Sequence, residues 1–350
     1  MEANITTVWP TNVSLLISSK MEIKVSDIMD IIQVFFYSVV FLIGSFGNGI
    51  VIWITARQAS RTVNCVWFFH LAMADFLFSV TRIVPLIKNA LYDGWPFGSF
   101  LCKANSFLKY LNMFCSVFLL ADISLDRAAS VAFPVWSKTR RGPRLAWMAA
   151  VGAWSAATAT SLPFYVYRTT AIEKDNRTKC SLSLGDDKVA QLALYLLRFI
   201  CGFLAPFTII VICYGVITLK LTRRQATLRS KRPFKVILAI VITFFLCWAP
   251  YHLFLLLKLA GVKNKAVSVG LPLSSSLAYL NSCANPILYF FMGLDFRKKI
   301  GRLNLTGAFR KVLLEESGYY SRKPTKYRKE AASSTDGLEL PKSMEIDQVI

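Results

Sequence analysis

Seven long apolar runs, separated by short polar links, constrain what this chain can fold into. They lie at about residues 28–56, 64–90, 100–133, 145–167, 189–221, 236–260 and 267–292. Each run exceeds the roughly 20 residues that a helix needs to cross the hydrocarbon core of a bilayer. The composition agrees, because 55% of the 350 residues are hydrophobic, 17% are charged and the mean hydropathy is +0.47. The sequence therefore predicts an all-α membrane protein, a bundle of seven transmembrane helices.

The polar segments divide the rest of the chain. We expect an extracellular amino-terminal tail at residues 1–27, the seven-helix bundle at 28–293, a short amphipathic eighth helix on the membrane surface at 294–304, and a disordered cytoplasmic tail at 305–350. The first tail lacks the order of charged, apolar and small residues that marks a cleavable signal. We therefore expect the first run itself to direct insertion.

Positive charge predicts the orientation. The net charge is +21, and basic residues gather in the links at 57–61, 138–144 and 220–235 and in the tail from residue 297. Basic links of membrane proteins stay in the cytoplasm, and an odd number of spans then places the amino terminus outside. Because these residues are spread over links rather than gathered on one folded domain, we expect the lipid bilayer, and no nucleic acid, as their partner.

The cysteines and the glycosylation signals fit this orientation. Of the eight cysteines, Cys102 and Cys180 fall at outer positions and the other six lie in apolar runs. The outer compartment is oxidising, so this pair predicts a disulfide that ties the second outer loop to the top of the third helix. Glycosylation signals occur at Asn4, Asn12 and Asn176 on the outer side. A fourth signal, at Asn304, lies on the expected inside and should stay unmodified.

A carboxylate lies deep in the second run, at Asp75. A charge at the centre of a bilayer costs about 2.5–3.5 kcal/mol on insertion scales, so Asp75 needs polar partners. The candidates on other runs carry amides or hydroxyls: Asn48, Asn112, Ser116, Asn281, Ser282 and Asn285. The cluster is either a set of interhelical hydrogen bonds or an oxygen-lined site for a hard cation.

Catalytic and metal-binding patterns do not occur in the sequence. The two histidines, His70 and His252, lie on different runs, and there is no zinc-protease pair, nucleophile elbow, phosphate loop or dinucleotide fingerprint. We therefore expect no enzyme and no metal centre. For His70 we expect a structural role as a hydrogen-bond partner, with Trp154 as the candidate.

Each run also carries one motif, and the motifs occur in a fixed order. They are GN at Asn48, LAMAD at Asp75, Asp126-Arg127, Trp154, Pro206, CWAP around Pro250 and NPILY from Asn285. Together they resemble a rhodopsin-like (class A) G-protein-coupled receptor over about residues 28–299. The stretches TVNCVWFFHLAMADFLF, WPFGSFLCKANSF and RFICGFLAPF are similar to the chemoattractant branch, which includes chemerin-like, formyl-peptide and anaphylatoxin receptors.

The resemblance implies a function. The expected protein is a receptor of the plasma membrane that binds an extracellular peptide or small protein of the chemoattractant type and activates a heterotrimeric G protein, of the inhibitory class. In the resting state Asp126 would hold Arg127. The residues of the expected activation switch are Asp126, Arg127, Tyr214, Trp248, Pro250, Asn285, Pro286 and Tyr289.

Two regulators are expected as well. An allosteric sodium ion would bind at Asp75 and favour the inactive state. Arrestin would bind a phosphorylated tail, whose candidate sites are Ser317, Ser321, Thr325, Ser333, Ser334 and Thr335.

Three residues depart from the family pattern. Ala128 follows Arg127, where most of the family has an aromatic residue or cysteine, and this leaves open a decoy or scavenging receptor that internalises ligand without G-protein coupling. Tyr110 stands where formyl-peptide receptors carry an acid, which argues against formyl-methionine ligands. Asp122 is an additional acid without an assigned role.

A transporter is disfavoured, because neither half of the chain mirrors the other.

Basic residues in the outer part of the bundle predict the charge of the ligand. Lys109 and Arg198 lie deep enough to point into one cavity, whereas cations nearer the helix ends often extend to the interface instead. With Arg82, Tyr110 and His252 they form the candidate ligand site. A guanidinium binds a carboxylate through two parallel hydrogen bonds, and an ammonium adds a point charge. We therefore predict a ligand that enters carboxyl terminus first.

Overall fold

The computed structural model describes residues 25–56, 62–172, 176–185, 187–223, 232–262 and 264–293. Several expectations lie outside these residues, namely glycosylation at Asn4 and Asn12, the surface helix at 294–304 and the phosphorylation sites from Ser317 to Thr335.

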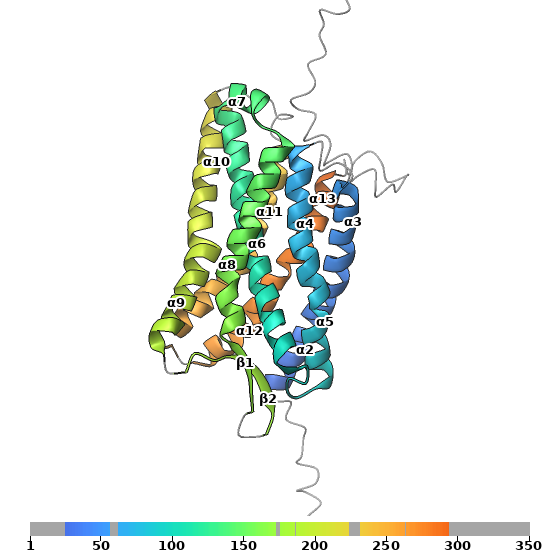
Figure 1. The fold of residues 1–350 in the computed structure, drawn as a ribbon, viewed down its shortest axis with the longest axis vertical. Helices are drawn as coiled ribbons and strands as arrows, with labels where there is room; N and C mark the ends of the chain where they lie inside the picture. Colours follow the sequence, from blue (N-terminus) through green and yellow to red (C-terminus); the bar gives the residue numbers. More distant parts are fainter. Residues whose placement is uncertain are drawn as a thin grey trace, which may run out of the picture.

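Within the described residues, helices join end to end into seven columns (Figure 1). The columns are α2 (Val25–Val39), η1 (Val40–Gly44) and α3 (Ser45–Ala56); α4 (Val63–Thr81) and α5 (Ile83–Leu91); α6 (Gly98–Ala132); α8 (Pro143–Val166); α9 (Lys188–Phe199), η2 (Ile200–Leu204) and α10 (Ala205–Arg223); α11 (Arg232–Leu259); and α12 (Lys265–Tyr279) and α13 (Asn281–Gly293). A short helix, α7 (Pro134–Thr139), links α6 to α8. The seven expected spans are therefore confirmed to within a few residues at each end.

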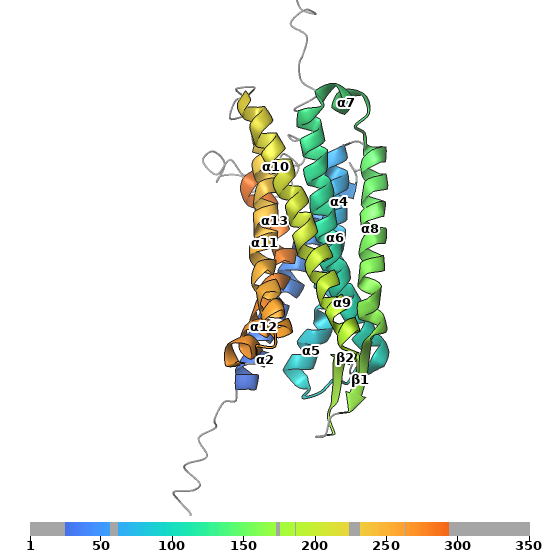
Figure 2. The same ribbon diagram turned by 90° about the vertical axis from the view of Figure 1, so that its left-hand side faces the viewer.

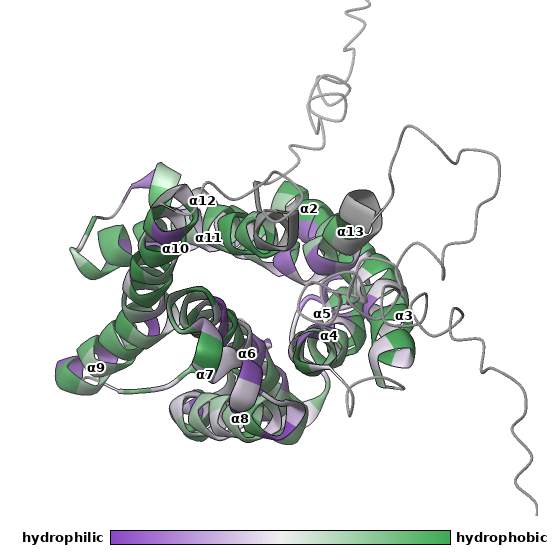
Figure 3. Ribbon diagram, turned by 90° about the horizontal axis from the view of Figure 1, so that it is seen from above, coloured by the Kyte–Doolittle hydropathy of each residue, from purple (hydrophilic) through white to green (hydrophobic). Residues whose placement is uncertain are grey.

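Most columns satisfy the simple criterion for a membrane span. Five helical stretches in the described residues are long and apolar enough to cross a membrane, and α8 and the α12–α13 column are not among them. The reasons are visible in the sequence: α8 is rich in alanine, serine and threonine, and the last column is interrupted at Leu280. Both still pack in the same bundle, as Figure 3 shows along its long axis.

The third column, α6, lies at the centre of the bundle. It packs against α4, α8, α10 and α11, and Figure 2 shows it between the α9–α10 column and α8. The outward faces carry exposed apolar side chains such as Phe46, Met148 and Leu246, whereas Asp75 and Asn48 are fully buried inside. Apolar surface outside and polar groups inside is the arrangement that a lipid solvent favours.

Several columns are interrupted by a π-helical turn or by a break between two helices. A π-helical turn, η2, ends two residues before Pro206, where we expect a bend, and α12 gives way to α13 at Leu280, before Pro286. A second π-helical turn, η1, interrupts the first column, and the sequence did not predict it. π-Turns are frequent at functional sites, and η2 begins two residues after Arg198.

A two-stranded hairpin lies at one end of the bundle, where the sequence predicted only a loop. Strand β1 (Arg168–Ile172) pairs antiparallel with β2 (Thr178–Leu182), and Thr170 lies opposite Cys180. A disulfide joins Cys102 of α6 to Cys180, which confirms the expected pair. Asn176 in the connecting turn is exposed and has a φ of 60°, a backbone conformation that asparagine tolerates better than most residues. We call this end of the bundle the hairpin end and the opposite one the α7 end (Figure 1).

Candidate functional site

Arg198 is a buried cation near the hairpin end. It lies in the last turn of α9 and is 6% exposed. One terminal nitrogen, Nη1, donates a hydrogen bond of 2.6 Å to the hydroxyl of Tyr251 on α11. The guanidinium carbon also lies 4.6 Å from the ring centroid of Tyr110 and 5.0 Å from that of Phe164. Neutral oxygen and aromatic faces therefore surround this charge.

Lys109, on α6, lies near the rings of Tyr110 and Tyr251, and Arg198 lies near the same two rings. Its ammonium nitrogen lies 5.7 Å from the ring centroid of Tyr110, 5.6 Å from that of Tyr251 and 5.1 Å from that of Tyr279. It donates a hydrogen bond of 3.3 Å to Ser275, whose hydroxyl in turn donates to Tyr279. The expectation that Lys109 and Arg198 meet is therefore consistent with the geometry, because both contact the rings of Tyr110 and Tyr251.

Arg82 lies on the other side of Tyr279 and is differently engaged. Its guanidinium donates to Asn105 at 2.9 Å and to the backbone oxygen of Phe78 at 3.3 Å, and its carbon lies 5.7 Å from the Tyr279 ring centroid. Since it is only 1% exposed, Arg82 is largely committed to its own helix and to α6.

These three cations have no carboxylate partner among the described residues. The two ion pairs found there join Arg141 to Asp126 and Arg177 to Asp93, both away from the cluster. Two guanidinium groups and an ammonium ion repel one another in a low-dielectric interior. The arrangement can therefore bind an anion, and a carboxylate matches the fork of Arg198.

His252 lies beside Arg198 in an aromatic environment. Its ring centroid is 4.8 Å from that of Phe203, 5.5 Å from that of Tyr251 and 6.3 Å from that of Trp248. It is 1% exposed, and neither ring nitrogen has a hydrogen-bond partner in the described part of the chain.

The sequence did not predict Tyr251 and Tyr279 as members of this cluster. Their spacing from the motif residues Pro250 and Asn285 was the signal that could have found them.

The polar cluster around Asp75 forms as expected, one layer deeper. Asn112 donates to one carboxylate oxygen at 2.9 Å and Asn285 to the other at 2.8 Å. Ser116 and Ser282 lie against the same carboxylate, and the Asn48 amide donates to the backbone oxygen of Ser282 at 2.8 Å.

Oxygen atoms remain available in this cluster. The side-chain oxygens of Asn48, Asn281 and Asn285 are buried and have no hydrogen-bond partner among the described residues. A single carboxylate with neutral oxygens is a donor set that suits a hard monovalent cation such as sodium, although the amide hydrogens would have to share Asp75 with the ion.

At the α7 end the structure differs from expectation. The carboxylate of Asp126 accepts two hydrogen bonds of 2.7 Å from Arg141, from Nε and from Nη2. Arg127 instead donates to the side-chain oxygen of Asn64 at 2.5 Å. The expected pairing of Asp126 with Arg127 is therefore wrong for this structure. The reason is geometric, because the loop after α7 brings a second guanidinium to the acid in an ideal bidentate orientation.

The other residues of the expected switch are spread along the bundle. Tyr214 lies on α10, and Trp248 and Pro250 lie one half-turn apart on α11, where the Trp248 ring contacts Phe244 and Tyr251. Asn285 and Pro286 are adjacent on α13. The side chain of Tyr289 is outside the described ones.

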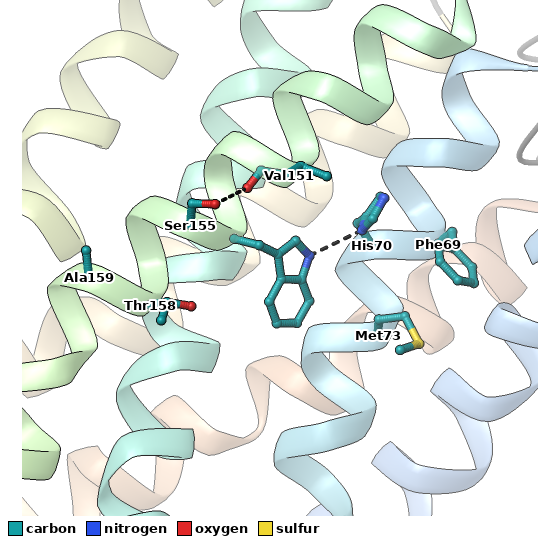
Figure 4. Close-up of a pocket in the computed structure, with 8 residues that line it drawn as sticks. Phe69, His70, Met73, Val151, Ser155, Thr158 and Ala159 are labelled. Atoms are coloured by element: carbon teal, nitrogen blue, oxygen red, sulfur yellow. Dashed lines mark hydrogen bonds between the residues drawn. The ribbon is translucent and has the colours of Figure 1, made fainter.

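His70 has the structural partner that the sequence predicted. The indole nitrogen of Trp154 donates to Nδ1 of His70 at 3.2 Å (Figure 4). Both residues line an apolar groove between α4 and α8 that also includes Phe69, Met73 and the exposed Val151. The histidine therefore serves helix packing.

Comparison with known families identifies the fold. A family model described as 7 transmembrane receptor (rhodopsin family) matches residues 47–289. The chain belongs to this receptor family. The receptor is therefore a multi-pass membrane protein, and its family is one of signalling receptors rather than enzymes.

Individual relatives cover most of the receptor. Chemerin-like receptor 1 of Bos taurus is 43% identical over 316 residues, which are 84% of this chain and 85% of that protein. The C3a anaphylatoxin chemotactic receptor of Danio rerio is 41% identical over 295 residues, 83% of this chain and 80% of that protein. Formyl peptide receptor 2 of Mus musculus is 36% identical over 315 residues, 85% of this chain and 89% of that protein.

Proposed function

We propose that the receptor binds a chemoattractant-type peptide or small protein at the hairpin end and activates a heterotrimeric G protein, of the inhibitory class, at the α7 end. The hairpin end then faces the extracellular space and the receptor resides in the plasma membrane, as the basic links near the α7 end favour. The relatives are named a chemerin-like receptor, a C3a anaphylatoxin chemotactic receptor and a formyl peptide receptor, and these names support the ligand class.

The observation that carries the proposal is a pair of cations that have no carboxylate partner in the part of the chain that the structure describes. Arg198 and Lys109 contact the same two tyrosine rings, and Arg198 donates to the Tyr251 hydroxyl. A ligand carboxylate replaces that neutral acceptor with a charged one, and charge-assisted hydrogen bonds are about twice as strong as neutral ones. The ligand therefore enters carboxyl terminus first, with Tyr110 and His252 beside it.

The Asp75 cluster is proposed as a sodium site that stabilises the inactive state. A ligand that prefers one state shifts the population by its differential affinity. The oxygen atoms of Asn48, Asn281 and Asn285 support this assignment, since no described residue donates a hydrogen bond to them.

A screen of chemoattractant peptides with cAMP and arrestin readouts tests the proposal. We expect at least one free-acid peptide to lower cAMP and to recruit arrestin. Arrestin recruitment or internalisation without any cAMP change contradicts G-protein coupling and favours a scavenging receptor, which Ala128 after Arg127 keeps as the second candidate. No response to any peptide in either assay contradicts the ligand class.

A further inference from the structure

Arg141 is an arginine that the proposed function does not use. It lies in the short link between α7 and α8, and its side chain is 14% exposed. Its guanidinium binds both oxygens of Asp126 at 2.7 Å, and Nη2 also reaches the side-chain oxygen of Asn64 at 3.3 Å. The acid is 11% exposed, so this ion pair is shielded from most of the solvent.

Asn64 connects this pair to Arg127. It lies in the first turn of α4 and is 2% exposed. Its side-chain oxygen accepts from Arg127 at 2.5 Å and from Arg141 at 3.3 Å. Three segments, α4, α6 and the α7–α8 link, therefore meet at one carbonyl oxygen and one carboxylate, and two guanidinium groups share them.

The two acceptors differ in strength. Asp126 carries a full negative charge and accepts bidentate hydrogen bonds, whereas Asn64 offers a neutral oxygen. Arg127 would gain more from the carboxylate next to it in the chain, yet it binds the amide. The carboxylate is already occupied by the fork of Arg141, and this explains the choice.

We propose that Arg141 is a positioning residue that competes with Arg127 for Asp126. While Arg141 occupies the carboxylate, Arg127 is directed to Asn64. When Arg141 is removed, Arg127 turns to Asp126. The link between α7 and α8 thereby sets the position of the arginine that the activation switch depends on.

A stability measurement on the purified receptor tests this competition without any ligand or G protein. The melting temperature is measured for Asp126→Asn, Arg127→Gln and the double variant, in three backgrounds: the unchanged receptor, Arg141→Ala and Arg140→Ala. Arg140 is the matched control, because it is the neighbouring arginine and its side chain is exposed.

We expect a small non-additive shift in the unchanged and Arg140→Ala backgrounds, because Asp126 and Arg127 are already linked there through Arg141 and Asn64. In Arg141→Ala we expect this shift to be larger by about 2–4 °C, since a direct interaction between Asp126 and Arg127 has formed. Equal coupling in all three backgrounds overturns the proposal. If Arg141→Ala does not fold, Arg141→Lys takes its place, since a lysine cannot make the bidentate pair and should give a smaller coupling of the same sign. The absence of any coupling in that variant also overturns the proposal.

Signalling provides a second readout that rests on the proposed function. Arg141→Ala should lower agonist potency about tenfold while Arg140→Ala leaves it unchanged, because Arg127 must first leave Asp126. Unchanged potency in Arg141→Ala, with coupling seen in the stability cycle, contradicts a role in activation. A receptor that activates no G protein even without substitutions contradicts the proposed function alone, and the stability cycle then decides the competition by itself.

Discussion

Asp75 is the residue at which a single charge matters most. It is fully buried, and both carboxylate oxygens already accept amide hydrogens from Asn112 and Asn285. Amide donors alone leave the net charge of the carboxylate uncompensated inside a low-dielectric bundle. A cation bound beside it would compensate that charge and also engage the oxygens of the surrounding asparagines, which have no hydrogen-bond partner within the described ranges.

If sodium binds at Asp75, the affinity of the receptor for an agonist should depend on sodium. Agonist affinity should be lower in sodium than in an equal concentration of a large organic cation, because sodium favours the inactive state. Asp75→Asn should remove the difference. The matched control is Asp122→Asn, which removes another acid from a membrane-spanning helix and should leave the difference in place. Radioligand competition in the two salts measures it, and equal affinities in the unchanged receptor would rule out the site.

At the scale of elements, the hairpin and α6 act as one unit. The disulfide between Cys102 and Cys180 fixes β2 to the first turn of α6, and the Trp95 backbone nitrogen donates to the backbone oxygen of Thr178 at 2.7 Å. The strands β1 and β2 alone would be marginally stable, because an isolated two-stranded hairpin has no core. The position of the hairpin at this end of the bundle therefore depends on these links.

The same connection predicts how cysteine substitutions behave. Cys102→Ala and Cys180→Ala should each abolish ligand binding at the cell surface, and the double variant should be no worse than either, since one bond can be removed only once. Cys115→Ala, a substitution of a buried free cysteine on the same helix, should retain binding. Additive losses from Cys102→Ala and Cys180→Ala, measured with labelled ligand and corrected for surface expression, would contradict a shared role.

How far the sequence predicted these features depends on the range of the interaction. Apolar runs and proline positions located the helices, because lipid exposure and backbone hydrogen bonding act along the chain itself. The Asp75 cluster was predictable as well, since a lone buried acid requires partners. Arg141 could not be chosen as the partner of Asp126, because the choice between two nearby arginines depends on the path of the α7–α8 link. Likewise, the sequence did not predict that Tyr251 accepts from Arg198, since the contact joins two separate columns.

At the scale of the whole molecule, α6 connects the proposed binding end to the proposed signalling end. This helix has 35 residues, and at about 1.5 Å per residue it connects Cys102 at one end to Arg127 at the other. Lys109 and Asn112 lie between them, so the ligand cluster, the Asp75 layer and Arg127 share one rigid element. Interfaces between packed helices have few alternative arrangements, and a small change at one end can shift the equilibrium at the other.

Separation of the two ends predicts separable defects. Arg127→Ala should abolish G-protein activation. Ligand affinity should fall only by the amount that a coupled G protein contributes to it. Arg140→Ala, which removes an exposed arginine near the same end, should leave both unchanged. Nucleotide exchange and ligand binding on the same membranes measure the two properties. Full activation by the Arg127→Ala receptor would contradict the assignment of this end.

The central claim is that Arg198 receives the carboxyl terminus of the ligand. The most direct measurement is the affinity of one agonist peptide, as free acid and as C-terminal amide, for the unchanged receptor and for Arg198→Ala. Lys188→Ala is the control, because Lys188 lies at the exposed start of the same helix. Removing one member of a buried charge pair costs about 2–5 kcal/mol, or roughly thirty-fold to several thousand-fold in affinity. The account predicts a loss of that size for the free acid, a far smaller loss for the amide, and no change in the control. An equal loss for both peptides would show that Arg198 supports packing and would contradict the claim.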